Sequence, residues 1–474
     1  MPMPHCTSPP HVMTLCLLPI LVCAPLAYPS VLTQESRIEN PTPAGNDKMG
    51  SSLAAGANWL AAGAPRDTTW GTYTGEVAIF PWGASTGWGT PFTITEPTLG
   101  NFAFYGTSVA ANDEDDRLVV GCPGYAITSP RVGAAWIYDI NPTAGSASLI
   151  TMLSPAGLSN GDDFGYAVAI YNDYIAVGAP DYNDTGAVWI YQIDSSNNWV
   201  QQMVLQPSDL VSGSEFGFSL AMHEDRLVIG APGHSAGGQD AGRVYVYDLI
   251  NTTWATWGQV ADWDGPAGAR LGEAVDVSES CVVAGAPEEA TSLSMSGRVH
   301  RYLYNGRTDV WSELSSLEGS GSGDRFGAAV SCQGYRTLVG APGEQTDGTD
   351  VGRAYLFNEE LELAIFDDDL ANSHDEVGAS VHLATATAFA GAPGAAAGNN
   401  QNGGIVTEWD ALGTPGCPGD HNADLVVDAD DLETFLKNMT VYPTASPSLS
   451  DLDDNAITNV VDLIELLAVW GSCP

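Results

Sequence analysis

Alternating short apolar runs and turn residues dominate most of this chain. Between Asp163 and Pro180 an apolar run ends at Ile170, an Asn172-Asp173 corner follows, and a second apolar run is closed by Pro180. A third run, 186–191, comes after a short polar loop. This pattern predicts three antiparallel strands joined by tight connections. Such a small meander buries only part of its apolar surface by itself, so we expect it to pack against similar neighbours.

The same pattern recurs along the chain, which predicts a repeat protein. Each unit carries a Gly-Ala-Pro element, or Gly-Cys-Pro once: Gly63-Ala64-Pro65, Gly121-Cys122-Pro123, Gly178-Ala179-Pro180, Gly230-Ala231-Pro232, Gly285-Ala286-Pro287, Gly340-Ala341-Pro342 and Gly391-Ala392-Pro393. An apolar residue followed by glycine precedes each element: Met49-Gly50, Tyr105-Gly106, Phe164-Gly165, Phe216-Gly217, Leu271-Gly272, Phe326-Gly327 and Val377-Gly378. The seven prolines lie between 51 and 58 residues apart.

A period of this length with four strands per unit is typical of propeller blades rather than of solenoid coils. A fourth strand is expected just before each apolar-Gly pair, as at 199–205. The seventh unit lacks such a strand, but residues 31–38 precede the first unit and have strand character. We expect this N-terminal strand to complete the last blade, because closing the ring removes an open sheet edge. The prediction is an all-β, seven-bladed β-propeller.

The paired motifs resemble the FG-GAP repeat of integrin α-chain propellers and of related secreted bacterial proteins. The resemblance covers about residues 31–411 and implies a propeller that presents a binding face. In the calcium-binding members of that family, an Asp-rich loop separates the two halves of the motif. Here only tight turns stand there, such as Asn172-Asp173 and Glu224-Asp225, so these turns predict no calcium site.

The overall charge limits the classes of partner. The chain has 15 basic and 58 acidic residues, a formal net charge of −43. Such a surface repels nucleic-acid phosphates and anionic membranes, so no nucleic-acid partner is expected. Residues 1–27 contain no charged side chain and have an apolar centre, which predicts a secretory signal peptide. No later stretch is apolar over the length of a membrane span. We therefore expect a secreted protein, extracellular or at the cell surface.

Five of the eight cysteines lie beyond the predicted signal peptide. Cys122, Cys281 and Cys332 fall at or beside predicted strands, and we expect them to be buried as small hydrophobic residues. Cys417 and Cys473 bracket the C-terminal region, and we expect them to form a disulfide in an exported protein.

After a linker at 412–418 the pattern changes to acidic loops and helical stripes, which predicts a second domain at 419–474 following the propeller at 28–411. Two twelve-residue loops place oxygen ligands at positions 1, 3, 5, 9 and 12, with a backbone carbonyl at position 7. Their predicted ligands are Asp420, Asn422, Asp424, Val426, Asp428 and Asp431 in the first loop, and Asp451, Asp453, Asn455, Ile457, Asn459 and Asp462 in the second. This spacing wraps hard oxygen ligands around one calcium ion, so two Ca²⁺ sites are expected.

Each loop runs into a helical stripe with apolar residues at i, i+3, i+4 and i+7, from Leu432 and from Leu463. The duplicated loop-helix unit resembles an EF-hand-like type I dockerin domain. That resemblance implies docking to a cohesin-type receptor and a link to polysaccharide-degrading assemblies. Leu425 and Ala456 replace the turn glycine of the loops, and the positions after the ninth ligand lack the usual polar pair.

No catalytic motif stands out. The chain has no Gly-x-Ser-x-Gly elbow, His-Glu-x-x-His helix or phosphate-binding glycine loop. Acidic pairs such as Asp162-Asp163 and Glu288-Glu289 are the candidates for acid-base chemistry on sugars, against the alternative of ordinary surface charge. The connections that follow the seven Gly-Ala-Pro elements differ in sequence, and four aromatic residues there are candidate ligand contacts, with packing between blades as the alternative: Trp70, Tyr73, Tyr125 and Tyr182.

Three functions are compatible with these features. The first is a secreted, non-enzymatic binding or adhesion protein, whose propeller recognises an extracellular protein or glycan and whose calcium-binding tail docks to a partner. The second is an extracellular carbohydrate-active enzyme, or a component of a polysaccharide-degrading assembly. The third is a structural envelope protein with no discrete ligand. Saturable binding without turnover would distinguish the first from the second.

Overall fold

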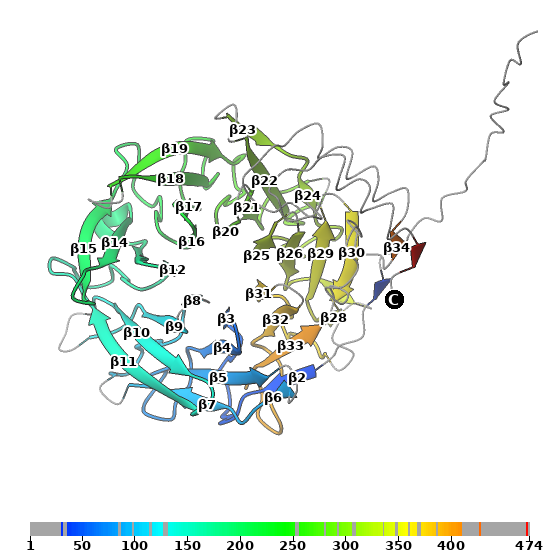
Figure 1. The fold of residues 1–474 in the computed structure, drawn as a ribbon. Coiled ribbons are helices and arrows are strands. Elements are labelled where there is room, and N and C mark those ends of the chain that lie inside the picture. The colour runs from blue at the N-terminus through cyan, green and yellow to red at the C-terminus, as the bar shows by residue number, and fades with distance from the viewer. Residues whose placement is uncertain are drawn as a thin grey trace, which may run out of the picture.

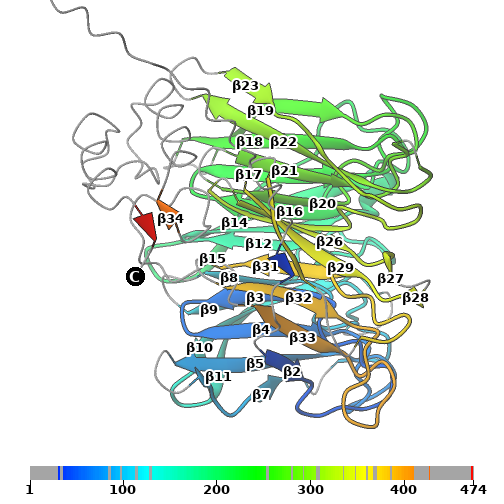
Figure 2. The same ribbon diagram turned by 90° about the vertical axis from the view of Figure 1, so that its right-hand side faces the viewer.

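The structure is a computed structural model. It describes residues 30–31, 36–409, 426–427 and 471–472, with interruptions at 84–86, 97–98, 113–115, 127–130, 252–255, 279–280, 292, 306–309, 335, 347–348, 359–360, 367–370 and 385–386. The described residues form seven antiparallel sheets arranged as blades around one axis (Figure 1), and Figure 2 shows the same ring from its edge. The predicted seven-bladed propeller is confirmed.

Each blade is built from successive antiparallel strands that run outwards from the axis. The innermost strands are β3 (Ser52–Gly56), β8 (Val109–Asn112), β12 (Val168–Tyr171), β16 (Ser219–His223), β20 (Ala274–Val277), β25 (Ala329–Gln333) and β31 (Ser380–Leu383). The second strands are β4 (Trp59–Ala64), β9 (Arg117–Cys122), β13 (Tyr174–Ala179), β17 (Arg226–Ala231), β21 (Cys281–Ala286), β26 (Arg336–Ala341) and β32 (Ala388–Ala392). The third strands are β5 (Glu76–Gly83), β10 (Ala134–Asn141), β14 (Ala187–Ile193), β18 (Arg243–Asn251), β22 (Arg298–Asn305), β29 (Arg353–Asn358) and β33 (Ile405–Trp409).

The outer strands complete the blades and are the least regular. Six blades carry β11 (Ser146–Leu153), β15 (Trp199–Leu205), β19 (Thr256–Asp264), β23 (Val310–Glu313) with β24 (Leu317–Glu318), β30 (Leu361–Phe366) and β2 (Ser36–Glu39). The first blade has two short pieces instead, β6 (Gly87–Trp88) and β7 (Phe92–Ile94). Smaller elements are the 3-10 helix η1 (Tyr182–Asp184) and the hairpin of β27 (Gln345–Thr346) and β28 (Thr349–Asp350).

The ring closes through the N-terminal strand, as predicted. Strand β2 pairs antiparallel with β33 of the seventh blade, and the innermost strands β31 and β3 lie against each other. The expectation that the segment 31–38 completes the last blade holds for β2 but not for Val31. Strand β1 (Ser30–Val31) pairs in parallel with β30, at the outer edge of the sixth blade. The first and last parts of the segment thus serve different blades.

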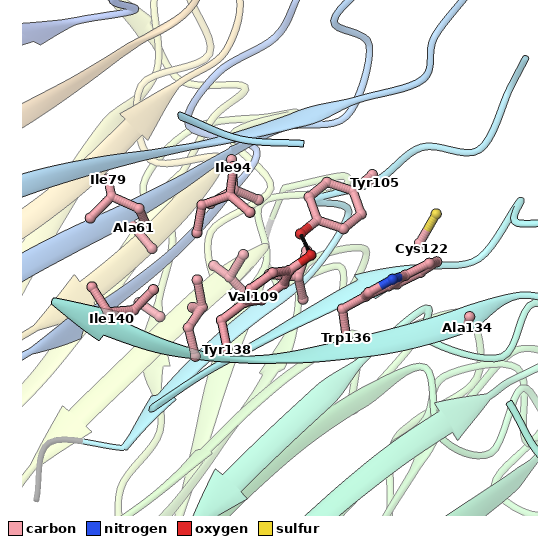
Figure 3. Packing of buried hydrophobic residues seen from close by; sticks show 14 of the residues in the cluster. Ala61, Ile79, Ile94, Tyr105, Val109, Cys122, Ala134, Trp136, Tyr138 and Ile140 are labelled. Atoms are coloured by element: carbon pink, nitrogen blue, oxygen red, sulfur yellow. Dashed lines mark hydrogen bonds between the residues drawn. The ribbon is translucent and has the colours of Figure 1, made fainter. Parts of the chain in front are cut away.

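The second strands are buried on both sides because each blade is covered by two neighbours. All six residues of β4, β13 and β21 are buried, whereas outer strands such as β15 have an exposed middle. Between the first two blades, Ile79 and Ala61 of one blade pack with Tyr105 and Trp136 of the next (Figure 3). Inside this cluster the hydroxyl groups of Tyr105 and Tyr138 form a 2.9 Å hydrogen bond. The predicted burial of Cys122, Cys281 and Cys332 is confirmed.

The two glycines of each repeat explain why the motif recurs. The glycine of every apolar-Gly pair has a φ between 84° and 93°, a conformation that L side chains rarely adopt. Its N–H donates to the carbonyl of the Gly-Ala-Pro glycine of the same repeat at 2.9–3.0 Å. A Cβ on that second glycine would lie 1.9–2.1 Å from a backbone oxygen of the following blade, so only glycine allows the blades to approach this closely.

Candidate functional site

One face of the propeller gathers both halves of every repeat motif. Pairing between the first two strands of a blade, such as Ser52 with Gly63 and Ser219 with Gly230, places the start of one strand beside the end of the other. The turn before each apolar-Gly pair therefore lies beside the connection that follows Gly-Ala-Pro. Backbone hydrogen bonds join them, as from Arg66 N to Asp47 O at 3.2 Å. We call this side the motif face.

A set of seven equivalent residues stands at the axial edge of the motif face. Each precedes the apolar residue of its repeat and leads into an innermost strand: Lys48, Phe104, Asp163, Glu215, Arg270, Arg325 and Glu376. All seven are partly buried and have φ between 54° and 62°. One unusual backbone conformation thus presents seven side chains of five residue types, acidic, basic and aromatic, which we call the axial ring.

Ion pairs connect the axial ring across repeat boundaries. Lys48 Nζ lies 2.9 Å from Glu376 Oε2, which joins the first and seventh repeats. Arg270 lies 3.0 Å from Glu215 of the preceding repeat. Glu273 lies within 3.0 Å of Arg270 and 2.6 Å from Arg325. The charges therefore form a chain of contacts around part of the axis.

Aromatic side chains complete this region beside the charged residues. The rings of Tyr166 and Phe218, which directly follow the motif glycines of repeats 3 and 4, lie 4.8 Å apart. The Arg270 guanidinium lies 5.8 Å from the centre of the Phe218 ring. Burial and nearby acids such as Glu215 raise the pKa of Tyr166 to about 12. Burial, with Asp181 and Asp162, raises the pKa of Asp163 to about 6. Aromatic, cationic and anionic groups thus lie close together at repeats 3 to 5.

The four aromatic residues singled out from the sequence occupy different environments. Trp70 is 56% exposed. Tyr73 packs against Phe104 of the axial ring, with 6.1 Å between ring centres. Tyr125 is buried edge-on against Trp136 at 4.8 Å. Tyr182 is partly buried and packs against Trp189 of its own blade at 5.0 Å. The packing alternative describes Tyr125 and Tyr182 best, while Trp70 and Tyr73 remain candidate contacts.

One member of each acidic pair named as an alternative catalytic group has structural partners. Asp162 is buried, and its carboxylate accepts the Ser159 N–H at 2.5 Å. Glu289 pairs with Arg298 at 3.1 Å and with His300 at 2.9 Å. Asp47, Asp324 and Asp375 repeat the Asp162 contact with the N–H three residues earlier. The four aspartates with this contact close the turn that leads into the axial ring.

Sequence reasoning missed the axial ring because it compared the residues that the repeats share. The signal was present at the position just before the apolar residue of each repeat. Six repeats carry an acidic or a basic side chain there, and one carries phenylalanine. A position whose side chain differs between repeats, while the surrounding backbone stays the same, is typical of a recognition surface.

The twelve predicted calcium ligands lie outside the described residues, except for the backbone of Val426. The structure describes there only the pairing of β34 (Val426–Val427) with β35 (Gly471–Ser472). Cys417, Cys473 and residues 1–27 also lie outside the described residues. Among the residues that are described, no helix is long and apolar enough to cross a membrane.

Comparisons with known proteins support the propeller part of the chain. The family model described as "FG-GAP repeat" matches residues 148–191, 199–247 and 311–357. Each match starts in an outer strand of one blade and ends in the third strand of the next, from β11 to β14, from β15 to β18 and from β23 to β29. Each sequence repeat therefore begins one strand before its structural blade. The last blade consequently lacks an outer strand from its own repeat, and the N-terminal strand β2 supplies it.

A curated relative is integrin alpha-11 of Mus musculus, 30% identical over 147 residues. The match covers 28% of this chain and 12% of the integrin chain. Among solved structures, Saccharomyces cerevisiae Sqt1 aligns over 77% of this chain and 84% of its own, with 12% identity and a TM-score of 0.41. The Sqt1 alignment is too weak to bear on function. The chain thus carries FG-GAP repeats in a seven-bladed propeller, with a likeness to a segment that is about an eighth of an integrin alpha chain.

Proposed function

We propose that this chain is a secreted, non-enzymatic binding protein that recognises an extracellular protein or glycan with the axial ring and its aromatic neighbours. The observation that carries this proposal is the axial ring itself: one repeated backbone position, on one face, with acidic, basic and aromatic side chains in different repeats. A rigid scaffold that varies at such positions is suited to recognition. The likeness to a segment of an integrin alpha chain supports a binding or adhesion role.

The region around Tyr166, Phe218 and Arg270 is the strongest candidate for the centre of the contact. Tyrosine and arginine are enriched among residues that dominate binding energy. The surrounding acids, Asp163, Glu215 and Glu273, would orient a ligand that carries a basic or hydroxyl-rich group. We place this contact at repeats 3 to 5.

In the same proposal the C-terminal module, residues 419–474, binds two calcium ions and attaches the chain to a partner, for which a cohesin-like receptor is the candidate. Its two matched ligand loops support this part. Calorimetric titration of the full chain with calcium tests it. Asp420→Ala and Asp451→Ala together should remove two binding events, and an unchanged titration would contradict the assignment.

Binding of the purified full chain to arrays of immobilised glycans and extracellular matrix proteins tests the propeller part. Tyr166→Ala with Phe218→Ala should weaken saturable binding at least about tenfold. The matched control is Tyr171→Ala, because Tyr171 lies at the opposite end of strand β12 and contacts His223 of the next blade. Equal losses in both variants would contradict the assigned face. Release of glycan products from the array would instead establish the carbohydrate-active enzyme.

A further inference from the structure

The first repeat contains three buried carboxylates with no basic partner among the described residues. Asp47 and Asp67 are fully buried, and Glu76 is 3% exposed. They come from the turn before the apolar-Gly pair, from the connection after Gly-Ala-Pro, and from the start of strand β5. Ionised carboxylates are seldom buried without a compensating charge, because removing them from water is very unfavourable.

The protein holds at least one oxygen of each carboxylate, and Glu76 is hydrogen-bonded to both Thr42 and Thr93. Asp47 Oδ2 accepts the Ala44 N–H at 2.5 Å and the Asn40 side-chain amide at 3.2 Å. Asp67 Oδ1 accepts the Thr69 N–H at 2.8 Å, and Glu76 Oε1 accepts the Thr42 hydroxyl at 2.7 Å. The remaining oxygens Asp47 Oδ1 and Asp67 Oδ2 are buried with no hydrogen-bond partner. Two buried acceptors are therefore unsatisfied in a cluster that carries only negative charge.

Three repeats, the fourth to the sixth, have an arginine at the position of Glu76, and the sixth is the best match to the first. Asp324, Glu344 and Arg353 occupy the places of Asp47, Asp67 and Glu76. The backbones match: Gly343 N donates to Asp324 O and Gly352 N donates to Glu344 O, both at 3.1 Å. The corresponding bonds of the first repeat, from Arg66 N to Asp47 O and from Gly75 N to Asp67 O, are both 3.2 Å.

The two repeats differ in one charge. In the sixth repeat the Arg353 guanidinium lies 3.0 Å from Glu344 and neutralises the buried acids. The fifth repeat uses Arg298 and Glu289 in the same way, at 3.1 Å. In the first repeat Glu76 stands at this position, so the position that supplies positive charge in the fifth and sixth repeats adds a third acidic group.

We propose that a small metal cation, Ca²⁺ as the best match, binds between Asp47 and Asp67 and replaces the missing guanidinium. Hard carboxylate oxygens are the ligands that calcium prefers. The acids are buried too completely for a lysine or arginine of a partner to reach them, whereas a bare ion is small enough. Glu76 supplies the remaining negative charge, and the Asn40 side-chain carbonyl and the Thr42 hydroxyl are nearby oxygens.

This site is distinct from the tight turns between the halves of the motif and from the C-terminal loops. It lies next to the closure of the ring, because Asn40 directly follows β2 and also donates to Gly403 O of the seventh repeat at 3.3 Å. In the described part of the chain no three acidic, histidine or cysteine side chains are already drawn together as metal ligands. Binding would therefore draw the carboxylates inward and tighten the junction between the first and last repeats.

The test uses the full chain with Asp420→Asn and Asp451→Asn, which removes the predicted first ligand of each C-terminal loop. Thermal unfolding is followed by the fluorescence of buried tryptophans in EDTA and in excess calcium chloride. Calcium at a hundredfold excess over its dissociation constant should raise the Tm by about 3 °C or more. Glu76→Arg should abolish this shift and should raise the Tm in EDTA, since it restores the charge that Arg353 supplies in the sixth repeat.

Two further variants keep the result interpretable. Asp67→Asn preserves shape and should also abolish the calcium shift, even if Glu76→Arg folds poorly. Asp173→Arg makes the same charge change at an exposed turn and should leave the shift intact. Retention of the shift in Asp67→Asn would overturn the proposal. So would a parent protein whose Tm ignores calcium and rises only on acidification, because protons would then neutralise the cluster.

Discussion

The first and sixth repeats fold alike and differ in how their buried charges are balanced. Both use an aspartate to close the turn before the apolar-Gly pair, and both bury a second acid after Gly-Ala-Pro. The sixth repeat adds Arg353, whereas the first adds Glu76. The comparison teaches that the glycines of the motif fix the backbone, while the residues beside them are free to take on separate roles.

The shared backbone gives the largest expected effect. Gly63→Ala and Gly340→Ala should each destabilise the propeller by at least about 3 kcal/mol, because the new Cβ would meet a backbone carbonyl oxygen of the next blade. Denaturant unfolding followed by fluorescence measures this loss. Gly100→Ala is the control, since Gly100, like Gly63 and Gly340, has no positive φ but has open space around it. A similar loss in all three variants would mean that the approach of the blades is not what requires glycine.

The charge balance gives the next effect. Arg353→Met removes the guanidinium from Glu344, whose side chain is only 9% exposed, and should destabilise the protein by about 3 kcal/mol. Arg66→Met is the control in the first repeat, because Arg66 is exposed and should change stability by less than about 0.5 kcal/mol. If both substitutions had equal effects in urea unfolding, the sixth repeat would not depend on its arginine.

The pH dependence of Arg353→Met sharpens this comparison. Burial raises the pKa of Glu344, opposed by hydrogen bonding to Tyr355 and by Arg353. Without the arginine the pKa should rise further, so the folded state holds a proton more tightly than the unfolded state does. Stability then increases as the pH falls from above the folded pKa toward the ordinary value near 4.5. The loss caused by Arg353→Met should therefore be largest at pH 8 and shrink toward pH 5.

Unfolding of Arg353→Met in urea at several pH values measures this trend. The double variant Glu344→Gln with Arg353→Met is the control, because it has no carboxylate to titrate at this position. A loss that stays constant between pH 5 and pH 8 would show that the arginine acts through packing rather than through charge.

The sequence predicted the fold well because the fold depends on what the repeats share. Seven glycine pairs with a regular period specify seven close approaches between blades, and the outer strand that the seventh repeat lacks points to β2. The split of the N-terminal segment between two blades was not predictable. Val31 pairs with Ile365, which is more than 300 positions away, and nothing local specifies that choice.

The sites were less predictable for the opposite reason. Asp47, Asp67 and Glu76 read as ordinary surface acids in a chain with 58 of them. Only the structure shows that they are buried together, and only alignment with the sixth repeat shows that an arginine is missing. Among the aromatic candidates, Tyr125 and Tyr182 stand where other repeats place Glu289 and Glu344, and all four side chains pack against the third strand of their own blade.

The smallest effect concerns the junction of the first and seventh repeats on the axial ring. Lys48 and Glu376 form an ion pair at 2.9 Å, but Glu376 is 45% exposed. Exposed pairs contribute less than about 1 kcal/mol and are screened by salt. The same junction is also held by β2 on β33, by a backbone bridge between Met49 and Gly404, and by the Trp88 indole on Glu408 at 2.7 Å. Lys48→Met should therefore lower stability by less than about 1 kcal/mol, and less still in high salt.

Glu215→Gln, which breaks the equivalent contact with Arg270 away from the junction, should have a similar effect in urea unfolding. A much larger loss for Lys48→Met would mean that the ring is closed mainly by charge, and that the buried acids of the first repeat and the axial ring act as one electrostatic unit.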